Sequence, residues 1–277
     1  MKRSIISAAT LAVLLASPLA VVSQTHAAEA APASPHTLTG NFTLTSDYRF
    51  RGISQTNKSP AVQGGIDYSH SSGFYVGTWA SNVSGLSYAN GSSMEWDFYG
   101  GYKLELAKDL TLDLGDLYYY YPGSYVTNPQ KTKYNNNEVY VGLSYKWLSA
   151  KVSYATTDYF GTNKDTFNSS TTDINGNNPL TANGGSRGST YLELNMAYPL
   201  TEKLTLNAHV GDTHVKHYGK LNYTDWKLGA SYDLNGWALG LHYVDTDKNK
   251  YYYVTEGDGS KHRIDKGTAV LSIGKTF

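Results

Sequence analysis

The sequence predicts an all-β protein, a transmembrane antiparallel up-and-down β-barrel of about 12 strands with short periplasmic turns and longer extracellular loops. Three observations predict it. Apolar residues recur at every second position in segment after segment of the 277-residue chain, which is typical of strands that separate two different environments. Short and long connections alternate between these segments, as in outer-membrane barrels. Aromatic residues gather at both ends of the apolar faces, where two membrane interfaces are expected.

Residues 1–27 are predicted to be a secretory signal peptide. Lys2 and Arg3 precede an apolar stretch, and small residues follow it, the usual order in such signals. The alternative is an uncleaved membrane anchor, but the short apolar core and the Ala-rich exit argue against it. Residues 28–37 are predicted to be a flexible lead and residues 38–277 the barrel. After residue 22 no stretch is long and apolar enough to span a bilayer as a helix. We therefore expect export through the periplasm to the bacterial outer membrane.

The first predicted strand runs over residues 40–51. Phe42, Leu44, Tyr48 and Phe50 share one face, and the other face carries charged side chains. Similar alternation predicts eleven more strands, near residues 62–68, 74–83, 94–104, 110–121, 138–145, 150–159, 192–198, 204–210, 225–232, 237–243 and 269–277. The inward face of residues 74–83 is left open, because Phe74 and Val76 compete with Tyr75 and Trp79 for the apolar side.

The predicted connections sort by length. Short turns are expected near residues 71, 107, 148, 200 and 234, and Asn235-Gly236 supplies the positive-φ positions of a tight hairpin. Longer loops are expected to begin near residues 51, 84, 122, 160, 213 and 246. The aromatic residues predicted beside the short turns are Tyr68, Tyr102, Tyr145, Tyr198, Tyr232, Trp237 and Phe277. Those predicted towards the long loops are Phe50, Trp96, Tyr118, Tyr120 and Tyr243.

The polar face of the strands is predicted to line a lumen. Its charged and histidine side chains are Asp47, Arg49, Arg51, Asp67, Glu95, Asp97, Lys103, Asp113, Glu138, Lys151, Glu193, His209, Lys227 and His242. Charges of both signs across a narrow lumen set a field that selects among solutes. The alternative is that these charges pair into a salt-bridged plug, as the interiors of small barrels are filled. Twelve strands lie between filled and open barrels, so strand number does not decide between the two.

Several segments resemble the TorF family of proteobacterial porins. The first hairpin carries the most specific part of the resemblance, Asp47-Tyr48-Arg49-Phe50-Arg51-Gly52-Ile53-Ser54-Gln55 followed by Gln63-Gly64-Gly65-Ile66-Asp67-Tyr68. Further matching segments occur in order along the chain: residues 73–83, Glu95-x-Asp97-x-Tyr99-Gly100-Gly101-Tyr102, Tyr120-Tyr121-Pro122-Gly123, Glu138-Val139-Tyr140, Asp158-Tyr159-Phe160-Gly161 and Asp225-Trp226-Lys227-Leu228-Gly229. The resemblance implies an outer-membrane location and a pore, without a known substrate. Residues 162–188 match no pattern of that family.

Composition narrows the chemistry. The chain has no cysteine, which excludes disulfides and thiolate zinc sites. Its formal net charge is zero, so nothing suggests a nucleic-acid partner. His209, His214 and His217 with Asp212 raise the hypothesis of a metal site, but their spacing runs from a strand into a loop. Asp173 opens a weak calcium-loop pattern that lacks the closing Glu, so an Asx turn is favoured.

These observations predict a porin-like channel for passive diffusion of small hydrophilic solutes or ions, embedded in outer-membrane lipid. No cofactor and no metal are expected. A non-conducting structural or binding barrel is the main alternative. An outer-membrane enzyme is a more remote one, because no spacing marks a nucleophile with its base. The transported solute and the oligomeric state are left open.

Overall fold

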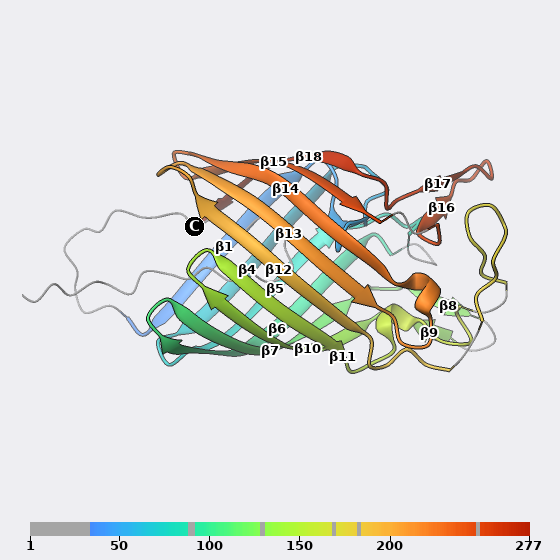
Figure 1. Cartoon of the computed structure of the whole chain (residues 1–277), viewed down its shortest axis with the longest axis horizontal. Coiled ribbons are helices and arrows are strands. Elements are labelled where there is room, and N and C mark those ends of the chain that lie inside the picture. The colour runs from blue at the N-terminus through green and yellow to red at the C-terminus, as the bar shows by residue number, and fades with distance from the viewer. Residues whose placement is uncertain (1–33, 88–91, 128–130, 168–169, 182–183, 248–249) are drawn as a thin grey trace, which may run out of the picture.

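The computed structural model describes residues 34–87, 92–127, 131–167, 170–181, 184–247 and 250–277. Twelve strands form one closed antiparallel barrel, which confirms the predicted fold (Figure 1). In chain order they are β1 (His36–Thr45), β4 (Ala61–His70), β5 (Phe74–Asn82), β6 (Met94–Ala107), β7 (Leu110–Tyr120), β10 (Asn136–Tyr145), β11 (Leu148–Ala155), β12 (Thr190–Pro199), β13 (Leu204–His214), β14 (Tyr223–Leu234), β15 (Trp237–Thr246) and β18 (Thr268–Thr276). The predicted signal peptide lies outside the described residues, and of the predicted lead only residues 34–37 are described.

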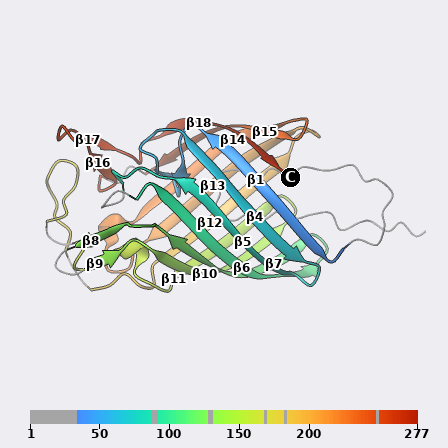
Figure 2. The same cartoon turned by 180° about the vertical axis from the view of Figure 1, so that it is seen from behind.

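The two ends of the barrel differ. Residues 71–73, 108–109, 146–147, 200–203 and 235–236 form the short turns at one end, where the C-terminus also lies (Figure 1). The opposite loop end carries the small hairpins β8 (Tyr125–Thr127)–β9 (Lys131–Lys133) and β16 (Tyr253–Thr255)–β17 (Lys261–Arg263), as Figure 2 shows from behind. It also carries two 3-10 turns, η1 (Tyr159–Gly161) and η2 (Gly219–Leu221). The predicted alternation of short and long connections is therefore confirmed.

Among the described residues, no helix is long and apolar enough to cross a membrane.

Strand alternation separates an apolar outer face from a polar and tyrosine-rich inner face. The strand β5 shows the rule and resolves the open choice of its faces. Phe74 and Val76 point outward and are about half exposed, whereas Tyr75 and Trp79 point inward and are 3% and 6% exposed. Successive side chains of a strand point to opposite faces, so the same separation follows around the barrel.

The first strand departs from the prediction. β1 ends at Thr45, and the chain then turns into the barrel as a small hairpin, β2 (Arg49–Phe50) and β3 (Ile53–Ser54). The two residues at its tip, Arg51 and Gly52, have φ of 47° and 79°, the left-handed geometry of a tight two-residue turn. The expectation that Tyr48 and Phe50 face lipid is wrong. Tyr48 is 1% exposed, and both rings join the inner aromatic cluster. We call residues 46–59 the inner hairpin.

Inward tyrosines lie over inward glycines of neighbouring strands. A Cβ on Gly101 would meet the Tyr75 hydroxyl at 2.5 Å, and one on Gly211 would meet the Tyr191 hydroxyl at 2.1 Å. Tyr99 covers Gly77, and Tyr140 covers Gly115, in the same way. Because glycine has no side chain, each tyrosine ring has room to lie flat along the barrel wall. This packing explains why many inward positions of the strands are glycine or tyrosine.

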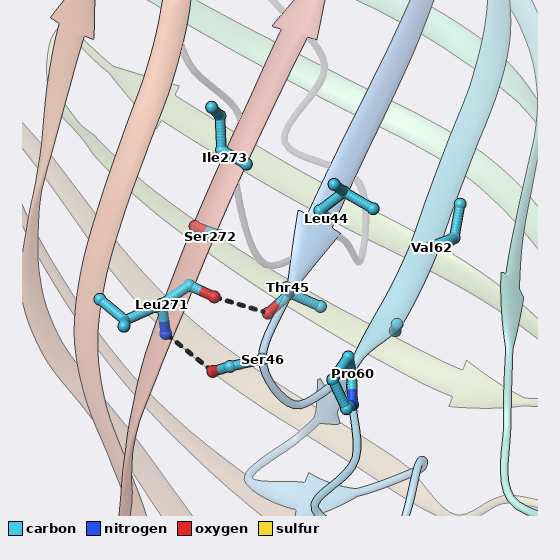
Figure 3. A pocket seen from close by; sticks show the side chains of 9 residues that line it. Leu44, Thr45, Ser46, Pro60, Val62, Leu271, Ser272 and Ile273 are labelled. Atoms are coloured by element: carbon cyan, nitrogen blue, oxygen red, sulfur yellow. Dashed lines mark hydrogen bonds between the residues drawn. The ribbon is translucent and has the colours of Figure 1, made fainter.

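The barrel closes where β1 meets β18. Their register runs from Asn41 opposite Thr276 to Thr45 opposite Ser272, and Gly40 and Phe277 exchange backbone hydrogen bonds of 2.7 and 2.9 Å. One residue beyond the last pair of this seam, the Ser46 hydroxyl accepts the Leu271 amide at 2.9 Å (Figure 3). A shallow outer groove follows the seam, with the apolar side chains Leu44, Val62, Leu271 and Ile273 along it (Figure 3). Ser46 thus holds the wall together at the point where the chain leaves it.

Candidate functional site

The inner hairpin is anchored at its base by Arg49. Its Nε donates to Asp47 at 2.6 Å, and its Nη1 donates to the carbonyls of Gly52, Ile264 and Lys266 at 2.9, 3.2 and 3.0 Å. The Asp47 carboxylate also accepts the hydroxyls of Ser54 and Thr56. Both side chains of the Arg49–Asp47 pair are at most 5% exposed. Charged donors and acceptors make the stronger class of hydrogen bond, so these contacts fix the hairpin against the connection that precedes β18.

Arg51 joins the tip of the inner hairpin to the far wall. Its two terminal nitrogens donate to the two oxygens of Glu138 on β10 at 2.6 and 3.0 Å, and Nη1 also donates to the Tyr159 hydroxyl of η1 at 3.1 Å. The guanidinium carbon lies 4.0 Å from the ring centroid of Tyr191 on β12. Burial disfavours the charge, but the Glu138 carboxylate, together with Tyr159 and Tyr119, outweighs that effect, so the pKa of Arg51 lies well above its ordinary value.

Aromatic side chains fill the space around the inner hairpin. Tyr48 packs edge-on against Trp79, with ring centroids 5.4 Å apart, and Phe50 does the same with Tyr119 and Phe160 at 5.5 and 5.6 Å. The carboxylate of Glu95 accepts the hydroxyls of Tyr48 and Tyr121 at 2.8 and 2.9 Å. The loop-end half of the lumen is therefore narrowed by the inner hairpin and the side chains that contact it. We call this region the constriction.

A second polar group lies on the wall formed by β11 to β14. Lys151 pairs with Glu193 at 2.8 Å. The Nε2 atom of His209 lies 2.9 Å from an Asp225 oxygen and 3.0 Å from the Tyr191 hydroxyl. Because Tyr191 also stacks on Arg51, this group is continuous with the constriction.

Towards the turn end the lumen carries partly exposed polar side chains. Asp67 accepts the Tyr99 hydroxyl at 2.5 Å, and Asp113 accepts the Tyr75 hydroxyl at 2.7 Å. The Lys103 ammonium lies 5.1 Å from the centroid of the Tyr75 ring. Asp67, Lys103 and Asp113 are of intermediate exposure, whereas Glu95 and Asp97 in the constriction are 0% and 3% exposed. Solvent thus reaches the inner wall from the turn end and is excluded at the constriction.

The structure places the predicted lumen residues in two different settings. Inward strand positions are occupied by Asp67, Glu95, Asp97, Lys103, Asp113, Glu138, Lys151, Glu193, His209, Lys227 and His242. Asp47, Arg49 and Arg51 were expected on the first barrel strand and lie instead on the inner hairpin. That these side chains line a conducting path stays a prediction.

Sequence reasoning missed the part played by inward tyrosines. Tyr48, Tyr75, Tyr99 and Tyr191 each donate a hydroxyl to a lumen carboxylate. For three of them the signal was present, since Tyr75, Tyr99 and Tyr191 share strand parity with charged or small residues. A tyrosine ring is amphipathic and fits either face of a membrane barrel. Only the parity of its position along the strand therefore indicates which face a tyrosine occupies.

The long connection between β11 and β12 packs across the loop end. Leu180 belongs to a buried cluster with Val215, Tyr218 and Leu221 of the β13–β14 connection, and the Tyr218 hydroxyl donates to the carbonyl of Gly184 at 2.7 Å. Near its start, this β11–β12 connection forms η1, and the Tyr159 hydroxyl of η1 accepts a hydrogen bond from Arg51. Within residues 162–188, the Ser186 hydroxyl accepts the backbone amide of Tyr159 at 2.8 Å, so this part of the connection helps to hold η1 beside Arg51.

The residues behind the metal and calcium hypotheses have separate partners. His214 contacts Asn222, and His217 contacts the carbonyl of Gly185. Within the described ranges, no group of three or more His, Cys, Asp or Glu residues is arranged to hold a metal ion. Asp173 accepts the side-chain amide of Asn178 and the backbone amides of Asn177 and Asn175, and these hydrogen bonds lower its pKa. That arrangement is an Asx-type turn.

The fold and the lumen define a class of protein, a closed β-barrel with an apolar exterior and a polar interior that an inner hairpin narrows. The chain belongs to the family described as a bacterial protein of unknown function (Gcw_chp), whose family model matches residues 29–277. This match does not extend to the TorF name, and that resemblance stays a prediction. Among curated proteins, none matches the chain.

Solved structures with a similar fold include porins. The KdgM porin is 10% identical with a TM-score of 0.48, and the match covers 86% of this chain and 98% of that one. A KdgM porin in complex with disordered oligogalacturonate is 9% identical with a TM-score of 0.47, covering 87% and 97%. The NanC porin is 14% identical with a TM-score of 0.46, covering 87% and 99%. All three TM-scores lie below one half, so these likenesses carry no argument for function.

Proposed function

We propose that this protein is an outer-membrane, porin-like channel for passive diffusion of small hydrophilic solutes or ions. The observation that supports it most is the reversal of polarity across one closed barrel wall. Leucine, valine and aromatic side chains point outward and are about half exposed, while charged residues and tyrosines point inward. A soluble barrel has no reason to expose that apolar band, whereas a bilayer requires it.

Two rings of exposed aromatic side chains support the membrane location. Near the turn end they are Tyr102, Tyr145, Tyr198, Tyr232 and Trp237, and towards the loop end they are Trp96, Tyr118, Tyr154, Trp226 and Tyr243. Rings with an apolar body and a polar tip favour the two interfaces of a bilayer. In this proposal residues 1–27 direct export, and the barrel begins with β1 at His36, two residues earlier than the sequence predicts.

One observation favours the second candidate, a non-conducting barrel. Arg51 and Glu138 are 6% and 3% exposed and link the inner hairpin to the far wall, so they form a buried bridge across the narrowed part of the lumen. A channel function therefore requires that the inner hairpin yields or that only very small solutes pass.

Single-channel recording in planar bilayers tests the proposal. We expect the parent protein to show small discrete conductance steps. The double variant Arg51→Ala/Glu138→Ala should show larger steps, because it removes both partners of the bridge together, so neither of the two charges is left buried without the other. Arg187→Ala is the matched control, since Arg187 lies exposed in a loop and should leave the conductance unchanged.

Silent bilayers with both the parent and the double variant contradict the channel proposal and favour the non-conducting barrel. Equal steps in parent and double variant show that the bridge does not limit passage. Migration of unheated and heated samples in detergent gels verifies that each protein is a folded barrel before it is recorded.

A further inference from the structure

The inner wall has an uneven distribution of charge around the barrel. The half-wall from β4 through β10 carries six inward carboxylates against a single inward lysine, Lys103, among its described strand residues. The carboxylates belong to Asp67, Glu95, Asp97, Asp113, Glu138 and Glu105, the last of which is exposed at the turn end. We call this surface the acidic half-wall. The opposite half, β11 through β15, mixes Lys151 and Lys227 with carboxylates and histidines.

The two halves also differ in how their charges are satisfied. On the mixed half, Lys151 pairs with Glu193. On the acidic half-wall only Glu138 has a basic partner within ion-pair distance among the described residues, and that partner is Arg51. Asp67, Glu95 and Asp113 accept hydrogen bonds from tyrosine hydroxyls. A neutral donor orients a carboxylate without cancelling its charge.

Asp97 adds an independent indication. It lies inward on β6, directly opposite Trp79 on β5 and Tyr119 on β7, and it is 3% exposed. Its Oδ1 atom is buried and has no hydrogen-bond partner among the described residues. A buried carboxylate oxygen without a donor is costly, and a cation that approaches it from the lumen reduces that cost.

We propose that the acidic half-wall makes the channel prefer cations over anions, an inference that rests on the proposed channel function. Surfaces of one sign with low-dielectric walls focus their field on the enclosed water, and carboxylates along a pore select cations. The screening length is about 10 Å at 0.1 M salt, so the field of the inward carboxylates extends into the lumen.

The inner-hairpin arginines do not reverse this preference. Arg49 is paired with Asp47, and Arg51 is paired with Glu138, so each positive charge is balanced at short range by one carboxylate. From the sequence alone, these two arginines are natural candidates for the residues that set selectivity. In this proposal the carboxylates without basic partners take that role.

The test is the reversal potential in a potassium chloride gradient, recorded for the parent and for the Arg51→Ala/Glu138→Ala variant. Both should reverse on the cation-selective side. In either background, the variant Asp67→Asn/Asp113→Asn should shift the reversal potential towards zero, because it removes two charges while keeping the shape of the side chains. Asp116→Asn is the matched control. Asp116 lies on the same strand as Asp113 but points outward and is exposed, so its loss should leave the reversal potential unchanged.

Each outcome separates the two proposals. Clear conductance with an anion-selective or unselective parent overturns the cation preference and leaves the channel function standing. An equal shift for Asp116→Asn and for Asp67→Asn/Asp113→Asn also overturns it, because the effect is then not a property of the inner wall. The absence of conductance in the parent and in the opened variant overturns the channel function, and the cation preference with it.

Discussion

An arginine in place of Val210 is expected to destabilise the folded barrel by about 2–4 kcal/mol. Val210 lies near the middle of β13, points outward and is 44% exposed. In the proposed membrane setting its side chain meets lipid, where a guanidinium loses its hydration. Reversible urea unfolding from lipid vesicles measures the free energy of unfolding directly.

Two further variants on β13 make the prediction sharper. Asn207 points inward, where its amide donates to Ser231 at 2.9 Å, so Asn207→Arg should keep most of the stability of the parent. Leu206 points outward but pairs with Tyr198 near the turn end, where the cost for arginine falls to about 0–1 kcal/mol. We expect Val210→Arg to lower the free energy of unfolding most and Leu206→Arg to lower it less. Asn207→Arg should remain close to the parent. If Asn207→Arg is the most damaging, the assignment of the two faces of β13 is inverted.

Replacing Gly101 by alanine is expected to destabilise the barrel by about 1–3 kcal/mol, the usual range for overpacking. Its new Cβ would lie 2.4 Å from the carbonyl oxygen of Leu114 and 2.5 Å from the Tyr75 hydroxyl. That hydroxyl is held by Asp113 at 2.7 Å and by Tyr140 at 2.5 Å. The ring of Tyr75 therefore cannot move aside without the loss of both contacts.

Gly142→Ala provides the matched control. Gly142 is also an inward glycine of the same barrel, but a Cβ there would meet its nearest neighbour, the Cβ of Asp113, at 3.6 Å, an ordinary contact. We expect this variant to be neutral or slightly stabilising, because alanine restricts the unfolded chain more than glycine does. The same urea titration compares the two. Equal stabilities would show that the tyrosine-over-glycine packing does not constrain the wall.

The sequence alone was enough to predict the barrel and the inward or outward direction of most strand residues. Period-two alternation determines which side chains share a face, and in a membrane barrel the outward face is the apolar one. Prediction from the sequence failed where the two faces of a strand are similar or where the chain leaves the barrel wall. In residues 74–83 aromatic rings occupy both faces, and in residues 46–51 the alternation continues through a segment that is no longer part of the barrel strand β1.

The candidate site was predictable as a set of residue types but not as a set of contacts. Parity identified Glu138 and His209 as inward residues. It did not indicate that Glu138 would receive Arg51 or that His209 would lie against Asp225, since these partners come from other elements. Inward tyrosines were seen as aromatic residues of strands, and their role as donors to lumen carboxylates became visible only with the walls in place.

By itself, the sequence determined that this chain forms a closed β-barrel, where its turns and loops fall, and which way most strand residues face, because these properties depend on periodicity within each short segment. Only the tertiary structure decided which interior charges are neutralised and which are left without an opposite charge. Arg51 and Glu138 are 87 residues apart, and Arg49 bonds to the carbonyl of Ile264 across 215 residues. Such contacts depend on how the barrel closes and on where the inner hairpin folds, which no local pattern of residues specifies.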